Sequence, residues 1–168
     1  CALPISAEYA AEPVLVQNSY IRTAELIQKE QGTTAAIAAY KNAIEKVEDR
    51  LFQARTQLTV ALMLFDQKQY LKAAEEYQIY LSAYEDVSAR VGFGHEKVLF
   101  RMAQCYQEQG RQVRQDPARA DEMIDDALAL YRQLLDEYGS STLIPDVLFN
   151  AGFAHQLKKE NEVARPFY

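Results

Sequence analysis

Residues 61–77 read ALMLFDQKQYLKAAEEY, and the spacing of small and bulky residues in this stretch recurs along the chain. Ala61 is followed three places on by Leu64 and twelve places on by Ala73, and Tyr77 lies four places after Ala73. The other copies are Ala24, Ile27, Ala36 and Tyr40; Ala103, Tyr106, Ala127 and Tyr131; and Gly152, His155, Ala164 and Tyr168. Two helices approach closely only where their side chains are small, and bulky neighbours then fill the remaining gaps. The recurring unit therefore predicts a fold of stacked helix hairpins.

This pattern resembles the tetratricopeptide repeat, a helix–turn–helix unit of about 34 residues, over nearly the whole chain. The resemblance implies an all-α, right-handed superhelix of antiparallel hairpins with about three and a half repeats. The expected repeats are 17–50, 54–87, 96–138 with a lengthened second helix, and a truncated 145–168, all in a single domain spanning 14–168. The chain departs from the family in having no tryptophan, and its repeats are 37, 42 and 49 residues apart.

Helix signals place the element boundaries. The expected helices are 14–31, 33–47, 51–67, 70–84, 96–109 and 117–138, with a further first helix from Pro145. Residues 1–13 carry Pro4 and Pro13 and no helical period, so we expect an extended N-terminal arm. Gly110 is expected to stop its helix, and 91–94 to form a loop. The long third repeat predicts either an overhanging helix or a docking surface formed by Asp121, Glu122, Asp125 and Asp126.

Composition excludes several classes of function. The chain has 168 residues, 49% of them apolar, and a net charge of −6 with no basic stripe, so nucleic acid is not an expected partner. The longest apolar stretch, 60–65, is too short for a transmembrane segment. No nucleophile, phosphate-loop or metal-binding motif is present, so we predict neither an enzyme nor a cofactor.

The family resemblance also predicts where a partner protein would bind. Ligands of the family lie along the concave face, which the first helices form. The corresponding positions predict an apolar partner groove formed by Ile21, Leu58, Leu62, Phe65, Phe100, Phe149 and Phe153. An exposed apolar groove normally marks a bound partner. The alternative is that these side chains pack on one another.

The ends of the chain predict self-association. The fourth repeat has a short second helix with Pro166, which would leave the apolar face of its first helix uncovered. The expected self-association residues are Leu3, Ile5, Tyr9, Val14, Leu148 and His155. We therefore expect a non-enzymatic scaffold that joins head to tail into a filament or ring, and so a homo-oligomer. The alternative is a monomeric envelope lipoprotein adaptor that binds other proteins in its groove.

Cys1 and two sequence stretches suggest export. The segments EYGSS at 137–141 and PDVLFNAG at 145–152 resemble exported bacterial members of the repeat family, the outer-membrane-assembly lipoprotein and periplasmic division-coordinator types. This resemblance implies a location in the periplasm, on the outer membrane or outside the cell rather than in the cytoplasm. Cys1 is then a candidate for lipid attachment, for a disulfide with Cys105 or for an intermolecular disulfide.

Overall fold

The computed structural model describes the backbone of residues 5–167 and the side chains of residues 13–167. Every regular element in this part of the chain is helical. The elements are α1 (Ile5–Gln31), α2 (Thr33–Lys46), α3 (Arg50–Asp66), α4 (Tyr70–Ala83), α5 (Glu85–Val91), α6 (His95–Gln112), α7 (Pro117–Glu137), α8 (Ile144–Leu157), α9 (Asn161–Ala164) and the 3-10 turn η1 (Arg165–Phe167). The predicted all-α class is confirmed.

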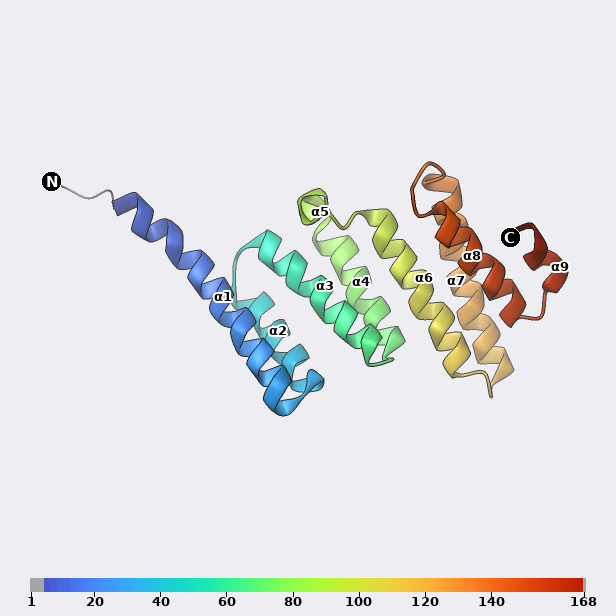
Figure 1. Cartoon of the computed structure of the whole chain (residues 1–168), viewed down its shortest axis with the longest axis horizontal. Helices are drawn as coiled ribbons and strands as arrows, with labels where there is room; N and C mark the ends of the chain where they lie inside the picture. The colour runs from blue at the N-terminus through green and yellow to red at the C-terminus, as the bar shows by residue number, and fades with distance from the viewer. Residues whose placement is uncertain (1–4, 168) are drawn as a thin grey trace.

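The helices stand side by side in one row, with the N-terminus at one end and the C-terminus at the other (Figure 1). Four hairpins make up this row: α1 with α2, α3 with α4, α6 with α7, and α8 with α9. Turns within the hairpins lie along one edge of the row, and connections between hairpins lie along the opposite edge (Figure 1). Between hairpins, α2 packs on α3, α4 on α6 and α7 on α8.

The small residues of the repeat pattern are buried, as residues at helix crossings must be. All eight are buried: Ala24, Ala36, Ala61, Ala73, Ala103, Ala127, Gly152 and Ala164. The aromatic residues that follow them, Tyr40, Tyr77 and Tyr131, are buried as well, while Tyr168 falls outside the described residues. The spacing in the sequence therefore marks positions that are buried between packed helices.

Two of the turns share one hydrogen-bonding pattern. Lys68 and Gln69, between α3 and α4, donate backbone N–H bonds to the carbonyl oxygens three and five residues back, at 2.8 and 2.9 Å. Lys159 and Glu160, between α8 and α9, make the same two bonds at 2.9 and 2.9 Å. Lys68 and Lys159 both adopt left-handed backbone, with φ of 60° and 63°. The second and fourth hairpins thus repeat in geometry as well as in sequence.

The expected extended arm at 1–13 is wrong for the residues that the structure describes, because α1 already begins at Ile5. Pro13 lies inside this helix. Proline removes one intrahelical hydrogen bond, but the preceding AEYAAE run at 7–12 is rich in alanine and glutamate, which favour helix strongly. The first turns of α1 project beyond the other helices (Figure 1).

Two further boundaries differ from the prediction. The short helix α5 fills part of the connection between the second and third hairpins, and it is anchored by the buried Val87. Helix α6 does not stop at Gly110 but continues to Gln112. A Cβ at Gly110 would lie 2.8 Å from Cδ1 of Ile124 in α7. Gly110 therefore permits a close helix contact and is not a stop signal.

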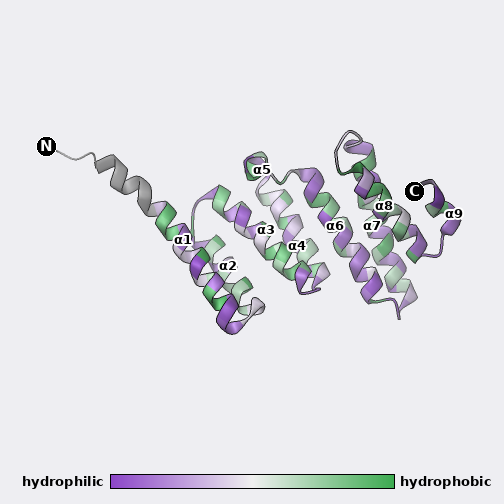
Figure 2. Cartoon of the chain, viewed as in Figure 1, coloured by the Kyte–Doolittle hydropathy of each residue, from purple (hydrophilic) through white to green (hydrophobic). Residues whose placement is uncertain are grey.

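The core forms two large clusters that meet in the middle of the row. One lies among α1–α6 around Tyr77, and the other lies among α6, α7 and α8 around Tyr131. The side chains of Leu81, Tyr106 and Leu130 pack against both clusters. The hydropathy colouring in Figure 2 shows α8 as largely hydrophobic, whereas α6 carries more hydrophilic residues. Among residues 5–167, no helix combines the length and the apolar character that crossing a bilayer requires.

A buried charged residue ties the first two hairpins together. The carboxylate of Glu76 in α4 is almost fully buried and accepts a bond from the ammonium of Lys41 in α2. Gln57 of α3 donates to the same carboxylate at 2.6 Å and to the Glu76 backbone carbonyl at 3.1 Å. Because three helices meet at one satisfied carboxylate, this network fixes their register.

Candidate functional site

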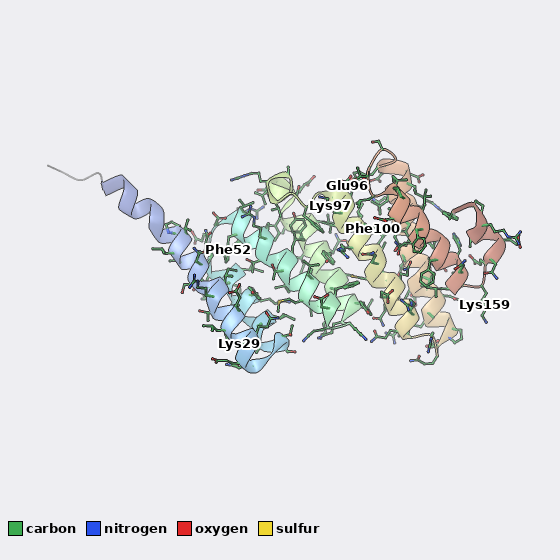
Figure 3. The ribbon with its side chains drawn as sticks, in the orientation of Figure 1. Lys29, Phe52, Glu96, Lys97, Phe100 and Lys159 are labelled. Atoms are coloured by element: carbon green, nitrogen blue, oxygen red, sulfur yellow. The ribbon has the colours of Figure 1, made fainter. Side chains whose placement is uncertain are left out.

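A groove runs between α6 and α8, the first helices of the third and fourth hairpins. Its wider part is a hollow of about 430 Å³. The lining residues are Lys97, Phe100, Arg101 and Gln104 from α6, Asp146 and Asn150 from α8, and Phe93 and Leu143 from the flanking connections. Figure 3 shows Lys97 and Phe100 on the part of α6 that follows α5.

The groove continues toward the turns of the second and third hairpins. A second hollow, of about 260 Å³, shares Gln104 and Asn150 with the first. It adds Phe65, Tyr70, Gln107 and Glu108 to the lining. The two hollows adjoin along α6 from Lys97 to Glu108, so together they can hold an extended segment rather than a single small group.

Helical periodicity explains why α6 presents a polar face here. Lys97, Arg101, Gln104 and Glu108 recur every three or four residues and therefore lie on one face of the helix. The residues between them are mostly buried against α4 and α7. Lys97 is exposed, and the other three are half-buried. The face toward the groove is therefore open to a ligand.

The floor of the groove is held by a network of neutral groups. Gln107 is 3% exposed, and its amide donates to Oδ1 of Asn150 at 3.3 Å. The hydroxyl of Tyr131 donates to Oε1 of Gln107, also at 3.3 Å. Burial raises the pKa of Tyr131, so this hydroxyl stays protonated and remains a donor at neutral pH. The Asn150 amide donates to the backbone carbonyl of Asp146 at 2.8 Å, which fixes its orientation.

The wider hollow of the groove carries more positive than negative side chains, although the chain as a whole is acidic. Lys97 donates to the Gly92 carbonyl at 3.0 Å, and Arg101 donates to Oε1 of Gln104 at 3.0 Å. Both cations therefore bond to neutral acceptors and keep their charge uncompensated at these contacts. Asp146 supplies the one carboxylate of the wider hollow. This hollow accordingly favours an anionic group next to α6.

The prediction of a continuous exposed apolar groove is wrong. Leu58 and Phe100 are 7% and 9% exposed and belong to the core. The ring of Phe100 packs on that of Tyr131, with centroids 6.1 Å apart. A partner protein has little access to either residue, so much of the predicted stripe packs internally.

The remaining residues of the predicted groove differ in exposure. Ile21, Phe65 and Phe153 are half-buried, while Leu62 and Phe149 are 40% and 59% exposed. Phe65 and Phe153 have aromatic or cationic neighbours within the chain. The Phe65 ring centroid lies 5.2 Å from that of Tyr70, and the guanidinium of Arg111 lies 5.7 Å from that of Phe153.

The predicted self-association residues that the structure describes lie in α1 and α8, near opposite ends of the row (Figure 1). Leu3 lies outside the described residues, and Ile5 and Tyr9 fall in α1, where only the backbone is described. Val14 is 54% exposed.

The prediction of a bare face on α8 is wrong. His155 bonds to a carboxylate oxygen of Glu160 at 2.8 Å, and its ring lies 5.3 Å from that of Phe167. Ala151 is buried, and Leu148 is half-buried. Because α9 and η1 both pack on α8, the short end segment supplies a cover that the repeat template did not lead us to expect.

Of the two cysteines predicted to form a disulfide or carry a lipid, the structure describes only Cys105. Cys1 lies outside the described residues. Cys105 is a free thiol with no exposed surface, and burial raises its pKa to about 12. A disulfide at this sulfur would require the surrounding core to open. We therefore withdraw Cys105 as a candidate for bridging or attachment.

The acidic residues of α7 do not form a free overhang. Ile124 is buried against α6, so the first half of α7 is packed. Asp125 forms an ion pair with Lys158, the residue that follows α8. Burial, with repulsion from Glu122 and Asp125, raises the pKa of Asp126. Part of this acidic run therefore joins the third hairpin to the fourth.

The first hairpin carries a hollow that the sequence argument missed. It measures about 590 Å³ and lies between α1 and α2. Its lining is Val16, Ser19, Tyr20, Thr23, Ile27, Gln31, Ala35, Ala38, Ala39 and Asn42. The spacing of Ala35, Ala38, Ala39 and Asn42 at helical intervals was the available signal, because it predicts a second small-residue face on this helix.

Comparison with protein-family models, with curated proteins and with solved structures found no match. Among the side chains of residues 13–167, no group of three or more histidines, cysteines, aspartates or glutamates is placed to hold a metal ion.

Proposed function

We propose that this chain is a non-enzymatic protein–protein interaction module, a right-handed superhelix of tetratricopeptide-like repeats that binds a segment of a partner protein between α6 and α8. The observation that carries the proposal is the groove, whose floor is a hydrogen-bonded network and whose charged α6 side chains are accessible to solvent. Gln107, Tyr131 and Asn150 satisfy one another beneath it. A ligand can therefore bind without leaving buried polar groups unpaired.

The lining also indicates which partner segment would fit. Lys97 and Arg101 favour an acidic group at the α5 end of the groove. Phe65 and Tyr70 offer apolar contact at the other end. Gln104 and Asn150, shared by both hollows, offer amide groups to the backbone of an extended segment. We therefore expect a segment that carries an acidic residue followed by an apolar one.

A peptide-display selection against the purified chain tests this proposal. Selected peptides would be measured by fluorescence anisotropy against wild type and the double variant Lys97→Glu/Arg101→Glu. We expect the variant to bind at least about tenfold more weakly, because it opposes the acidic residue with like charge. Lys29→Glu/Arg90→Glu changes the net charge equally at exposed sites on α1 and α5 and should bind normally. Equal affinity of both double variants, or recovery of no peptide, would contradict the proposal.

Head-to-tail or side-by-side self-association remains a second candidate, now through a different surface. The hollow between α1 and α2 is lined mainly by small and apolar residues, and Val14, Leu15 and Val16 are exposed next to it. Analytical ultracentrifugation at high micromolar concentration would detect an oligomer. Ala38→Glu, within the hollow, should dissociate it, whereas Ala89→Glu, exposed on α5, should not. A monomer at that concentration would remove this candidate.

Export and attachment through Cys1 remain predictions of the sequence resemblance. Mass spectrometry of the protein purified from its native source would reveal a diacylglyceryl or disulfide modification on Cys1.

A further inference from the structure

A further hollow, partly open to solvent, lies at the edge of the row where three hairpins turn, and the proposed function does not use it. It measures about 380 Å³. Its walls come from the α3–α4 turn, the end of α6, the start of α7 and the end of α8. The extra length of the third hairpin contributes to it, because Arg111, Arg114 and Asp121 lie in the stretch that the second hairpin lacks.

The inner surface of this hollow is apolar. Tyr70 and Ile124, which are 9% and 2% exposed, line it together with Gly110. Leu157 of α8 is half-buried and closes one side. Such a surface favours the hydrocarbon part of a ligand.

The rim of the same hollow carries a net positive charge. Arg111 is paired with Glu108 at 2.8 Å, so these two charges offset each other. Three charged rim residues remain, namely Lys68, Arg114 and Asp121. No ion pair or side-chain hydrogen bond joins Lys68 or Arg114 to another residue of the described chain. Two cations against one carboxylate leave one positive charge for a ligand.

We propose that this hollow binds a small organic anion, a carboxylate or sulfonate on an aromatic or branched hydrocarbon body. The anionic group lies between Lys68 and Arg114, and the hydrocarbon body lies against Tyr70, Ile124 and Leu157. The rim and the interior thus match the two halves of one amphipathic molecule. This site borders the peptide groove, because Tyr70 and Glu108 line both, but Lys68, Arg114, Ile124 and Leu157 line this hollow and not the groove.

The probe for this site is 1-anilinonaphthalene-8-sulfonate, titrated into protein labelled with carbon-13 at its isoleucine and leucine methyl groups. We expect saturable shifts of the Ile124 and Leu157 methyl signals. The double variant Lys68→Gln/Arg114→Gln should bind the probe about tenfold more weakly, since it removes both unpaired charges. Lys29→Gln/Arg90→Gln is the matched control and should leave binding unchanged. Uncharged N-phenyl-1-naphthylamine should bind more weakly than the sulfonate.

A second variant tests the hydrocarbon part of the site. Ala120 is half-buried in the wall of the hollow, so Ala120→Met should fill the space and abolish the methyl shifts while keeping the helix. The inference fails if the Ile124 and Leu157 signals stay unshifted at saturating probe. It also fails if Lys68→Gln/Arg114→Gln binds the sulfonate as tightly as the wild type does, or if the wild type binds N-phenyl-1-naphthylamine as tightly as the sulfonate.

Discussion

The second hairpin (α3 and α4) and the third hairpin (α6 and α7) cross at matching residues but end differently. Seven residues after the crossing residue Ala61 the chain is at Lys68, which already turns with φ of 60°. Seven residues after Ala103 it is at Gly110, which is still helical and is covered by Ile124. At this matched position the second hairpin has already turned, whereas the third continues as helix, and glycine there leaves room for Ile124 of α7.

Thiol reactivity at the seam between these hairpins should show the largest effect. Cys105 of α6 belongs to the same buried cluster as Tyr77 of α4, and burial raises its pKa to about 12. In a Cys1→Ser variant, alkylation by iodoacetamide at pH 8 should be about a thousandfold slower than in guanidinium chloride, because the thiolate is the reactive species. Mass spectrometry would give both rates.

The pH dependence of this reaction follows from the direction of the shift. Between pH 8 and pH 10 the pH stays below the pKa of the thiol in the folded protein, so the thiolate fraction rises about tenfold per pH unit. The alkylation rate should rise in the same proportion. In the unfolded chain the rate should level off near pH 9. A folded protein that is alkylated as fast as the unfolded one would show that the two hairpins do not seal this sulfur.

Gly110→Leu should have the largest effect on stability. A Cβ at this position would already lie 2.8 and 2.9 Å from two carbons of Ile124 and 3.1 Å from the Ala120 carbonyl oxygen. We expect a loss of about 3 kcal/mol in the free energy of unfolding, since overpacking outweighs the better helix propensity of leucine. Urea denaturation would measure it. A loss below the measurement error would mean that α6 and α7 are further apart than described.

Lys68→Gly should act in the opposite direction at the matching position. The left-handed backbone of Lys68 is strained for an L-residue, and glycine relieves this strain, so we expect a gain of about 1 kcal/mol. Lys159 has the same left-handed backbone in the turn of the last hairpin, so Lys159→Gly should also stabilise the protein. Destabilisation by both changes would contradict the turn assignment.

The two repeat tyrosines give the smallest and most specific test. The Tyr131 hydroxyl bonds to Gln107, whereas the Tyr77 hydroxyl is buried without a hydrogen-bond partner among the described residues. Tyr131→Phe should cost about 1 kcal/mol, and Tyr77→Phe should be neutral or stabilising, because it removes an unsatisfied polar group. Thermal unfolding of the two variants side by side would measure the difference. Equal losses would indicate that a bound water satisfies Tyr77.

Sequence spacing was sufficient for the helix crossings but not for the surface. Small residues at Ala61, Ala73, Ala103 and Ala127 can be recognised because burial demands them wherever two helices touch. Which side chains face a groove depends on how each helix is rotated about its own axis. Successive residues are about 100° apart around an α-helix, so a small error in this rotation moves a residue from the groove to the core. Phe100, predicted to be exposed in the groove, is 9% exposed and packs in the core. The other α6 residues that line the groove are charged or carry amides.

Features that depend on contacts distant in sequence were also missed. Nothing local distinguishes Gly110 as a contact residue, because its partner Ile124 lies across a connection of variable length. The same holds for the cover that α9 and η1 provide for α8, which a repeat template does not contain. The helix α5 was missed because Gly92 and Gly94 made its surroundings look like a loop.

The packing of each helix mainly on its neighbours along the chain has a consequence for folding kinetics. Contacts between segments close in sequence need little loop closure, so the chain should fold quickly for its length. Because each hairpin packs mainly on the adjacent hairpins, the protein can also unfold one hairpin at a time from either end. Helix α1 packs mainly on α2, and so its amide hydrogens should exchange with solvent well before those of α6, which is enclosed by α4 and α7.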